Sequence, residues 1–248
     1  SIPSYRSGFR RNYSTCSALL KITSDISTAL DDSQLCILTV LYYSKAFDMV
    51  NPQLLLAKLR YYGLAEAFCD WFNSYLSNRT QVVKLEDNVW SEIEMAVGVP
   101  QGSSLSPILF TTFTADLPSC LSSDVSAHLY ADDTQMYVFC NPQDINSAVS
   151  LLNKNLERTS EWSSNNGLSL NANKCKCMCI GSPVLRAKGL SLLSSEIRIQ
   201  RKVINTSMCE RNLGLLIDSH LNFQEHVIKT CKNGYFILRT LYLESGFI

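Results

Sequence analysis

The chain has 248 residues, 46% of them apolar, and its 22 Lys and Arg residues balance its 22 Asp and Glu residues. This composition excludes a disordered chain and predicts one large domain, or two interleaved subdomains, with a sizeable core. The sequence has no secretory signal and no apolar run long enough to cross a bilayer, so we expect an intracellular protein of the cytoplasm or nucleus without a membrane partner. Ten cysteines without a paired framework fit a reducing compartment. From the start at Ser1 rather than Met, we expect a fragment or an incomplete gene model.

Charge is distributed unevenly along the chain. Residues 1–173 contain 11 Lys and Arg against 17 Asp and Glu, whereas residues 174–248 contain 11 against 5. A neutral total argues weakly against a nucleic-acid enzyme, but a basic C-terminal third would attract a phosphate backbone. Ordinary variation in surface charge is the alternative explanation.

The N-terminal part predicts a helix, a strand and a second helix. Ser14 is a suitable N-cap for a helical pattern of apolar residues that extends to Leu30. Residues 35–41 form a continuous apolar, partly β-branched run, which predicts a strand buried on both faces. Asn51 and Pro52 then predict a helix start, because Asn caps helices and Pro is favoured in the first turn.

The next segment predicts a helix over residues 66–76, whose four aromatic side chains we interpret as core packing rather than as a stacking platform. They are Phe68, Trp71, Phe72 and Tyr75. Residues 79–97 alternate in hydropathy around an acidic turn at 86–88, which predicts a hairpin. Ser106 and Pro107 repeat the signal of a capping residue followed by Pro and predict another helix.

Two adjacent carboxylates, Asp132 and Asp133, lie between apolar and aromatic flanks at residues 125–130 and 136–139. Alternation in those flanks predicts a hairpin with the carboxylates at or near its turn. Like charges repel, so we expect a cation between them and a third group, and hard oxygen ligands favour Mg²⁺ or Mn²⁺. Taken alone, the turn is better explained as a solvated Asp-Asp pair, and only its context overturns that explanation.

The C-terminal part predicts a helix that starts at residues 141–142 and ends at 165–167, then two strands, the second over 174–180, and a final helix over 223–241. Three alternating cysteines of the second strand, Cys175, Cys177 and Cys179, would share one face. Zinc binding there is an alternative, although no His or fourth Cys is close in sequence.

Three segments, in this order, resemble motifs A, B and C of the reverse transcriptase palm of non-LTR (LINE, jockey-like) retrotransposons. They are Ser-Lys-Ala-Phe-Asp at 44–48, Gly-Val-Pro-Gln-Gly-Ser-Ser-Leu-Ser-Pro at 98–107 and Tyr-Ala-Asp-Asp at 130–133. Weaker resemblances mark a fingers segment at 7–15, motif D at 171–174 and motif E at 213–218.

The resemblance implies an α+β fold, a polymerase right-hand palm of antiparallel sheet backed by helices, with partial fingers and the start of a thumb. It divides the chain into partial fingers at 1–33, a palm with motifs A to D at 34–182 that carries a helical and hairpin insertion at 51–97, a motif E or primer-grip region at 183–219, and the start of a truncated thumb at 220–248. From the length alone, we expect neither an endonuclease nor an RNase H segment within these residues.

The family's chemistry is phosphoryl transfer to a primer 3′ end with two divalent metal ions, roughly 3.5–4 Å apart, usually held by three carboxylates. By resemblance, Asp132 and Asp133 are the catalytic, metal-binding pair of motif C. The third carboxylate of the family precedes the Ser-Lys-Ala-Phe-Asp segment by two residues, where this chain has Tyr42. A neutral phenol is a poor ligand for Mg²⁺. Asp48 is an alternative source of the third carboxylate, although it lies beyond the metal-binding position of motif A.

Other residues match substrate-binding positions of the family. Phe47 matches the aromatic gate whose ring collides with a ribose 2′-OH and so selects deoxynucleotides; a plain core Phe is the alternative. Gln101 and Gly102 match motif B residues that contact the nucleotide and let the template backbone pass closely, and Tyr43 is grouped with these substrate-binding residues. Lys174 matches the catalytic motif D lysine that can give a proton to departing pyrophosphate, with an ordinary surface charge as the alternative.

The resemblance therefore predicts an RNA-directed DNA polymerase domain that uses an RNA template, a DNA primer and dNTPs with Mg²⁺ or Mn²⁺. Tyr42 predicts that this copy is inactive or severely impaired, with its metal binding weakened or absent. The alternative is a catalytically dead remnant that only binds nucleic acid. A structural or interaction protein unrelated to polymerases would require three ordered motif matches by chance.

Overall fold

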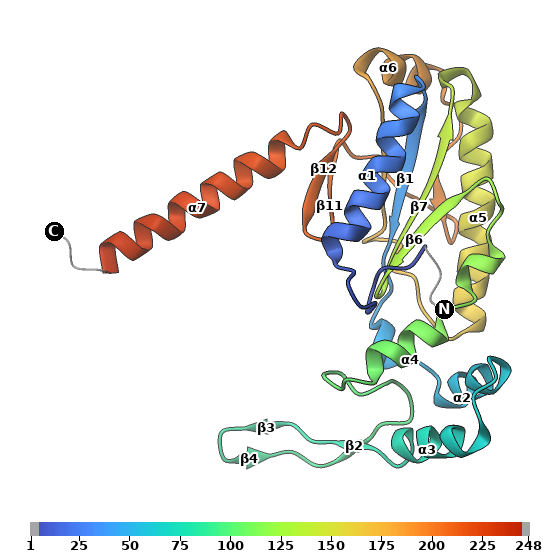
Figure 1. Ribbon diagram of the computed structural model, residues 1–248, viewed down its shortest axis with the longest axis vertical. Helices are drawn as coiled ribbons and strands as arrows, with labels where there is room; N and C mark the ends of the chain where they lie inside the picture. The colour runs from blue at the N-terminus through green and yellow to red at the C-terminus, as the bar shows by residue number, and fades with distance from the viewer. Residues whose placement is uncertain (1–4, 245–248) are drawn as a thin grey trace.

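The computed structural model describes residues 5–244, and its centre is a four-stranded antiparallel sheet (Figure 1). The strands lie in the order β6 (Ser126–Tyr130), β7 (Asp133–Cys140), β1 (Leu35–Leu41) and β8 (Lys176–Ile180). All seven residues of β1 are buried between β7 and β8, which confirms the prediction from its apolar run.

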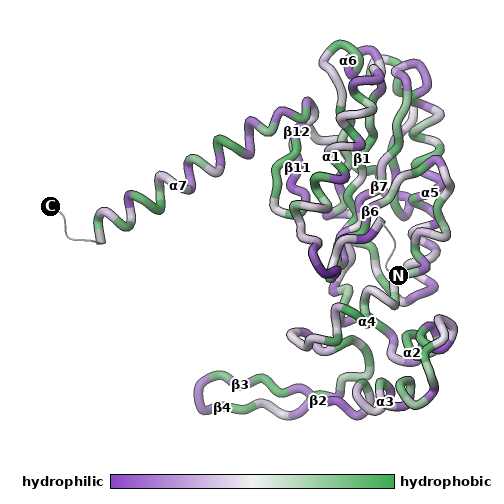
Figure 2. The backbone as a smooth tube through the Cα atoms, viewed as in Figure 1, coloured by the Kyte–Doolittle hydropathy of each residue, from purple (hydrophilic) through white to green (hydrophobic). Residues whose placement is uncertain are grey.

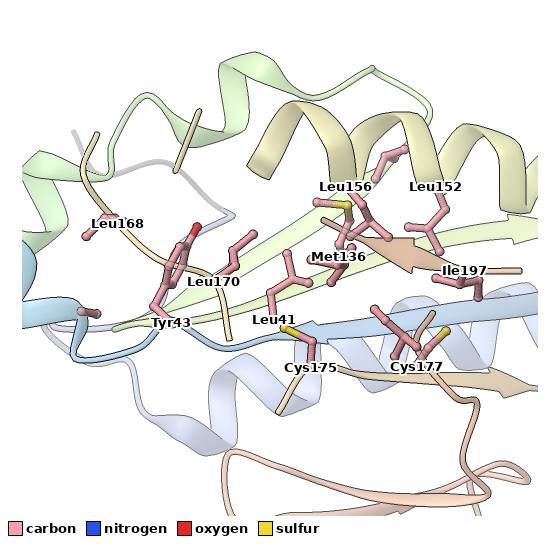
Figure 3. Packing of buried hydrophobic residues seen from close by; sticks show 14 of the residues in the cluster. Leu41, Tyr43, Met136, Leu152, Leu156, Leu168, Leu170, Cys175, Cys177 and Ile197 are labelled. Atoms are coloured by element: carbon pink, nitrogen blue, oxygen red, sulfur yellow. The ribbon is translucent and has the colours of Figure 1, made fainter. Parts of the chain in front are cut away.

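Two long helices cover opposite faces of this sheet. α1 (Thr15–Asp31) begins after its predicted cap, Ser14, and packs its buried side on one face. α5 (Ile145–Asn165) packs on the other face through residues that include Leu152 and Leu156, which Figure 3 shows among the buried side chains of the strands. Because successive side chains of a strand point to opposite faces, the apolar run of β1 supplies both layers of the core.

Smaller elements complete the region around the sheet. β11 (Cys209–Asn212) and β12 (Leu215–Asp218) form a hairpin on the same face as α1, and β12 lies within the segment that resembles motif E. α6 (Pro183–Leu192) lies near one end of the sheet, and β9 (Arg198–Ile199) pairs with β10 (Lys202–Val203) beside α5. Two 3-10 turns complete the connections: η2 (Leu117–Cys120) and η3 (Pro142–Asp144).

The segment between β1 and β6 forms a second group of elements, which lies below the sheet in Figure 1. Besides η2, it contains one short 3-10 helix, three α-helices and a long hairpin: η1 (Ala46–Met49), α2 (Pro52–Tyr61), α3 (Glu66–Leu76), the strand pair β2 (Thr80–Gln81) and β5 (Ile93–Glu94), the pair β3 (Lys84–Leu85) and β4 (Asn88–Val89), and α4 (Ser106–Phe113). The predicted helix start at Pro52 is confirmed, and so is the hairpin around residues 86–87.

α7 (Gln224–Glu244) follows β12 and extends away from the sheet (Figure 1), close to its predicted range. Apolar residues recur along this helix (Figure 2), and several of them are exposed, including Tyr235 and Phe236. Within residues 5–244, no helix is both long and apolar enough to span a membrane.

Three local predictions are wrong. β8 begins at Lys176 rather than at residue 174, and the strand predicted before it is reduced to a single bridge between Tyr43 and Leu170. Ser106 is the first residue of α4 rather than its cap, because its hydroxyl donates to the Pro100 carbonyl at 2.5 Å.

The aromatic side chains of α3 require a larger correction. Phe72 and Tyr75 pack partly against the core, as predicted, but Phe68 is 60% exposed and Trp71 is 52% exposed. Only one side of α3 faces the core, so the interpretation of all four rings as core packing is wrong for Phe68 and Trp71.

Candidate functional site

Asp132 and Asp133 lie at the tight turn between β6 and β7, as predicted. Tyr130 pairs with Asp133, so Ala131 and Asp132 form a two-residue turn in which Ala131 has a left-handed φ of 53°. Burial raises the pKa of Asp133 to about 6, and the charge of Asp132 contributes to the increase. Two carboxylates in this arrangement are stabilised by a cation placed between them.

Tyr42 lies next to this pair because of the register between β1 and β7. Leu41 pairs with Thr134, so Tyr42 follows at the level of Asp133, and strand alternation directs both side chains to the same face. The Tyr42 hydroxyl donates to the Arg211 carbonyl at 3.1 Å. Burial, with a smaller contribution from the charge of Asp133, raises the pKa of Tyr42 to about 12, so it is a neutral phenol at neutral pH.

A cleft of about 540 Å³ opens beside the turn and brings together residues far apart in the sequence. Asp132 lines it from the turn, Phe47 from η1, and Gln101 and Gly102 from the loop before α4. The Phe47 ring stacks on Phe110 with centroids 4.5 Å apart, so Phe47 both packs on the core and faces the cleft. Gly102 has a φ of 82°, a conformation that favours glycine.

Asp48, the alternative source of a third carboxylate, lies apart from the residues that line the cleft with Asp132. It accepts a hydrogen bond from Nε2 of Gln101 at 2.7 Å and lines a neighbouring groove of about 710 Å³ rather than the cleft with Asp132. Among the described residues, no group of three or more His, Cys, Asp or Glu side chains is arranged to hold a metal ion. Asp132 and Asp133 therefore offer two carboxylates to a cation, and the residue beside them at position 42 is a neutral phenol.

Four predicted site residues are not among those that line the cleft: Asp133 and Tyr42 beside the turn, and also Tyr43 and Lys174. Tyr43 is only 8% exposed, and its hydroxyl shares a hydrogen bond of 3.1 Å with Ser163 inside the core that Figure 3 shows. The structure thus gives Tyr43 a packing role instead of the expected substrate contact. Lys174 is exposed in the turn before β8, where its backbone N–H donates to Asn171, and its catalytic role stays a prediction.

The three alternating cysteines are buried in the apolar core. Burial raises the pKa of Cys177 to about 12 and that of Cys179 to about 11, so these thiols stay protonated. Because zinc binds thiolates, the core environment argues against a zinc site there.

Sequence reasoning missed a contact between the N-terminal segment and the carboxylate turn. Residues 5–9, the N-terminal strap, run beside β6, where the Ser7 N–H donates to the Leu129 carbonyl at 3.1 Å. The Ser7 hydroxyl lies 2.9 Å from Nε2 of His128, and burial lowers the pKa of this histidine to about 4. The strap therefore fixes β6 just before the carboxylates.

Two signals in the sequence point to this contact in retrospect. Gly8 packs so closely on the turn that a Cβ at this position would collide with the backbone nitrogen of Ala131, and no other glycine precedes Gly63. His128 falls in the apolar half of a predicted strand, where a buried imidazole needs a polar partner.

A family model described as reverse transcriptase (RNA-dependent DNA polymerase) matches residues 1–217. The chain belongs to this family. Two curated relatives from Drosophila melanogaster are each 28% identical: the probable RNA-directed DNA polymerase from transposon BS, over 94% of this chain, and the RNA-directed DNA polymerase from mobile element jockey, over 91%. The chain spans only 26% and 24% of their lengths. It is thus a reverse transcriptase domain of the non-LTR retrotransposon type, as the motifs predicted.

A solved structure supports the fold of this reverse transcriptase domain. Telomerase from Candida Tropicalis, in complex with the TWJ fragment of telomeric RNA, aligns with a TM-score of 0.54 at 12% identity over 83% of this chain and 32% of the telomerase chain. At this identity the likeness shows the fold alone, and it confirms the predicted palm-like class. Reverse transcriptases of this family generally use divalent metal ions.

Proposed function

We propose that this reverse transcriptase domain binds an RNA template, a DNA primer and dNTPs, and that this copy has lost most or all of its polymerase activity. The observation that carries the proposal is the position of Tyr42, in register with Asp133 where the family has its third carboxylate. A remnant that only binds nucleic acid is the limiting case of the same proposal.

The residues around the cleft have complementary roles in this proposal. Asp132 and Asp133 would hold Mg²⁺ or Mn²⁺, weakly or not at all, and a bound ion supplies electrostatic stabilisation of charge on the phosphates. Phe47 excludes a ribose 2′-OH, because its ring is fixed by stacking and faces the cleft. Gln101 contacts the nucleotide, and Gly102 lets the template backbone approach because it carries no side chain.

The remaining roles follow from the positions of the other motifs. Lys174, which is exposed in the turn before β8, is the proposed proton donor to pyrophosphate because it matches the motif D lysine. The division into partial fingers at 1–33, palm at 34–182, primer grip at 183–219 and thumb start at 220–248 is part of the proposal, as is a location in the cytoplasm or nucleus, where RNA templates and dNTPs occur.

Binding and catalysis should be measured in one sample. We expect a fluorescent RNA–DNA primer–template to bind the chain, with no detectable nucleotide addition in Mg²⁺ and at most a trace in Mn²⁺. Asp132→Asn is the matched control: it should keep the binding and remove any trace of extension. Extension at rates ordinary for polymerases overturns the loss of activity, and failure to bind any primer–template overturns the nucleic-acid role.

A further inference from the structure

An exposed aromatic ridge on α3 has no role in the proposed active site. The rings of Trp71 and Tyr75 lie 5.8 Å apart and nearly parallel at 5°, and the guanidinium of Arg79, just after α3, extends the ridge at 5.4 Å from the Tyr75 centroid. Phe68 continues the ridge one helical turn before Trp71. Because Trp71 stays 52% exposed and Phe68 60% exposed, both rings keep surface that a further flat group can cover.

The ridge is continuous with the cleft. Arg79 lines the neighbouring groove of about 710 Å³, and two residues, Lys45 and Gln101, line both the groove and the cleft. At the centre of the ridge, the Tyr75 hydroxyl donates to the Ser103 hydroxyl at 2.6 Å, and Ser103 lines the cleft. A nucleic-acid strand that leaves the cleft along the groove would therefore reach the ridge without crossing the core.

Charge in the groove favours a polyanion. Its lining contains two cations, Lys45 and Arg79, and one carboxylate, Asp48, which already accepts the hydrogen bond from Gln101. The acidic residues of the hairpin tip, at 86–87, do not line the groove. Exposed aromatic rings beside cations are the combination that binds single-stranded nucleic acid, since every base has a face that stacks.

We propose that the ridge and groove bind the single-stranded 5′ part of the template, with bases stacking on Trp71 and Phe68 and phosphates contacting Arg79 and Lys45. This inference rests on the proposed function, because the template must leave the cleft for the groove to receive it. Stacking on an aromatic side chain tolerates any base, so the site is expected to have little sequence preference.

The test compares two primer–templates that differ only in a 5′ template overhang of about ten nucleotides, bound to the full chain and followed by fluorescence anisotropy. We expect the overhang to tighten binding, and Trp71→Ala to weaken the overhang complex roughly tenfold while leaving the blunt complex unchanged. Trp90→Ala is the matched control, because Trp90 is 53% exposed on the hairpin and takes part in no ring stack within the described residues. It should change neither affinity.

A second readout uses the intrinsic fluorescence of the ridge. In the double variant Trp90→Phe and Trp162→Phe, Trp71 is the remaining tryptophan of the chain, and the overhang should quench its emission while the blunt duplex should not. If Trp71→Ala impairs folding, Phe68→Ala replaces it, with the same selective loss expected.

The outcomes separate the two proposals. If neither primer–template binds, the proposed function and this inference both fail. If the blunt primer–template binds but the overhang adds no affinity, or if Trp71→Ala and Trp90→Ala behave alike, the inference is overturned and the proposed function stands.

Discussion

At the residue scale, the properties of the site follow from the partial burial of two neighbouring side chains, Asp133 and Tyr42. Asp133 is partly buried beside Asp132, which raises its pKa, and Tyr42 is held as a neutral phenol by its own raised pKa. Among residues 5–244, no positive side chain contributes to either shift. Without a bound cation, the Asp133 carboxylate therefore destabilises the folded state once it ionises.

The raised pKa of Asp133 makes the free energy of unfolding decrease as the pH rises. Folding raises the pKa of Asp133 from 3.8 to about 6, so the folded chain holds this proton more tightly than the unfolded chain. The stabilisation is fully present below about pH 4 and is lost as the pH rises through about 6. Asp133→Asn should raise the free energy of unfolding near neutral pH by about 1 kcal/mol, a value reduced for partial exposure of the site, and leave it unchanged at low pH.

Urea unfolding of both proteins across this pH range measures the effect. Arg60–Glu66 is an exposed ion pair between α2 and α3, so Glu66→Gln serves to show the response of a carboxylate whose partner is a cation. An Asp133→Asn protein that is less stable than the parent near neutral pH contradicts the assignment.

At the element scale, the β6–β7 hairpin depends on the N-terminal strap, residues 5–9. The strap pairs with β6 and places Gly8 against the backbone of Ala131, so there is no room for a side chain between the strap and the turn. The position of the carboxylates is thus set by a segment more than 120 residues away in the sequence.

Gly8→Ala should therefore strain or detach the strap. We expect a loss of roughly 1–3 kcal/mol in the free energy of unfolding, because the new methyl group meets backbone rather than a flexible side chain. Gly234→Ala is the control: Gly234 lies inside α7 with open space around it, so a gain of about 0.5–1 kcal/mol is expected. Equal effects of the two substitutions in thermal unfolding would contradict the close approach at Gly8.

The elements show what the sequence predicts and where it fails. The buried strand at 35–41, the helix after Ser14 and the carboxylate turn were predictable, because local pattern and capping decide them. The exposure of Trp71 was not, because a ring at helical spacing has the same pattern whether or not a partner covers it. The strap was missed for the same reason: its interactions with β6 are long-range and leave only a glycine and a buried histidine as signals.

At the scale of the whole molecule, the change from an acidic to a basic composition falls at residue 174, just before β8. The acidic first part of the chain builds most of the sheet and its helices, and the basic part from residue 174 builds β8, the β11–β12 hairpin and the extended α7. We predict that this basic part forms the positive side of a primer–template groove. The cations expected to contribute include Lys174, Lys176, Arg198, Arg201, Lys202, Lys229 and Lys232.

Binding of an RNA–DNA duplex should then weaken steeply as salt increases. Replacing Lys229 and Lys232 of α7 by Gln should reduce the slope of log affinity against log salt by about 1 for each phosphate that a lysine no longer neutralises. Arg60→Gln, on α2 in the acidic part, is the control and should leave the slope unchanged. A flat salt response, or an equal effect of Arg60→Gln, would show that the duplex binds elsewhere.

We propose that Tyr42 occupies the position of the third metal-binding carboxylate. Primer extension by the chain and by its Tyr42→Asp variant is the sharpest test of this proposal. Metal stabilisation of the transition state is worth several kcal/mol, and each ~1.4 kcal/mol is a tenfold change in rate, so the variant should be faster by roughly three decades or more. Both proteins should be assayed in Mg²⁺ and Mn²⁺, and again within a complete fingers, palm and thumb. A large gain in the variant is the predicted result. If the unsubstituted chain extends primers as well as the variant does, the assignment of position 42 is contradicted.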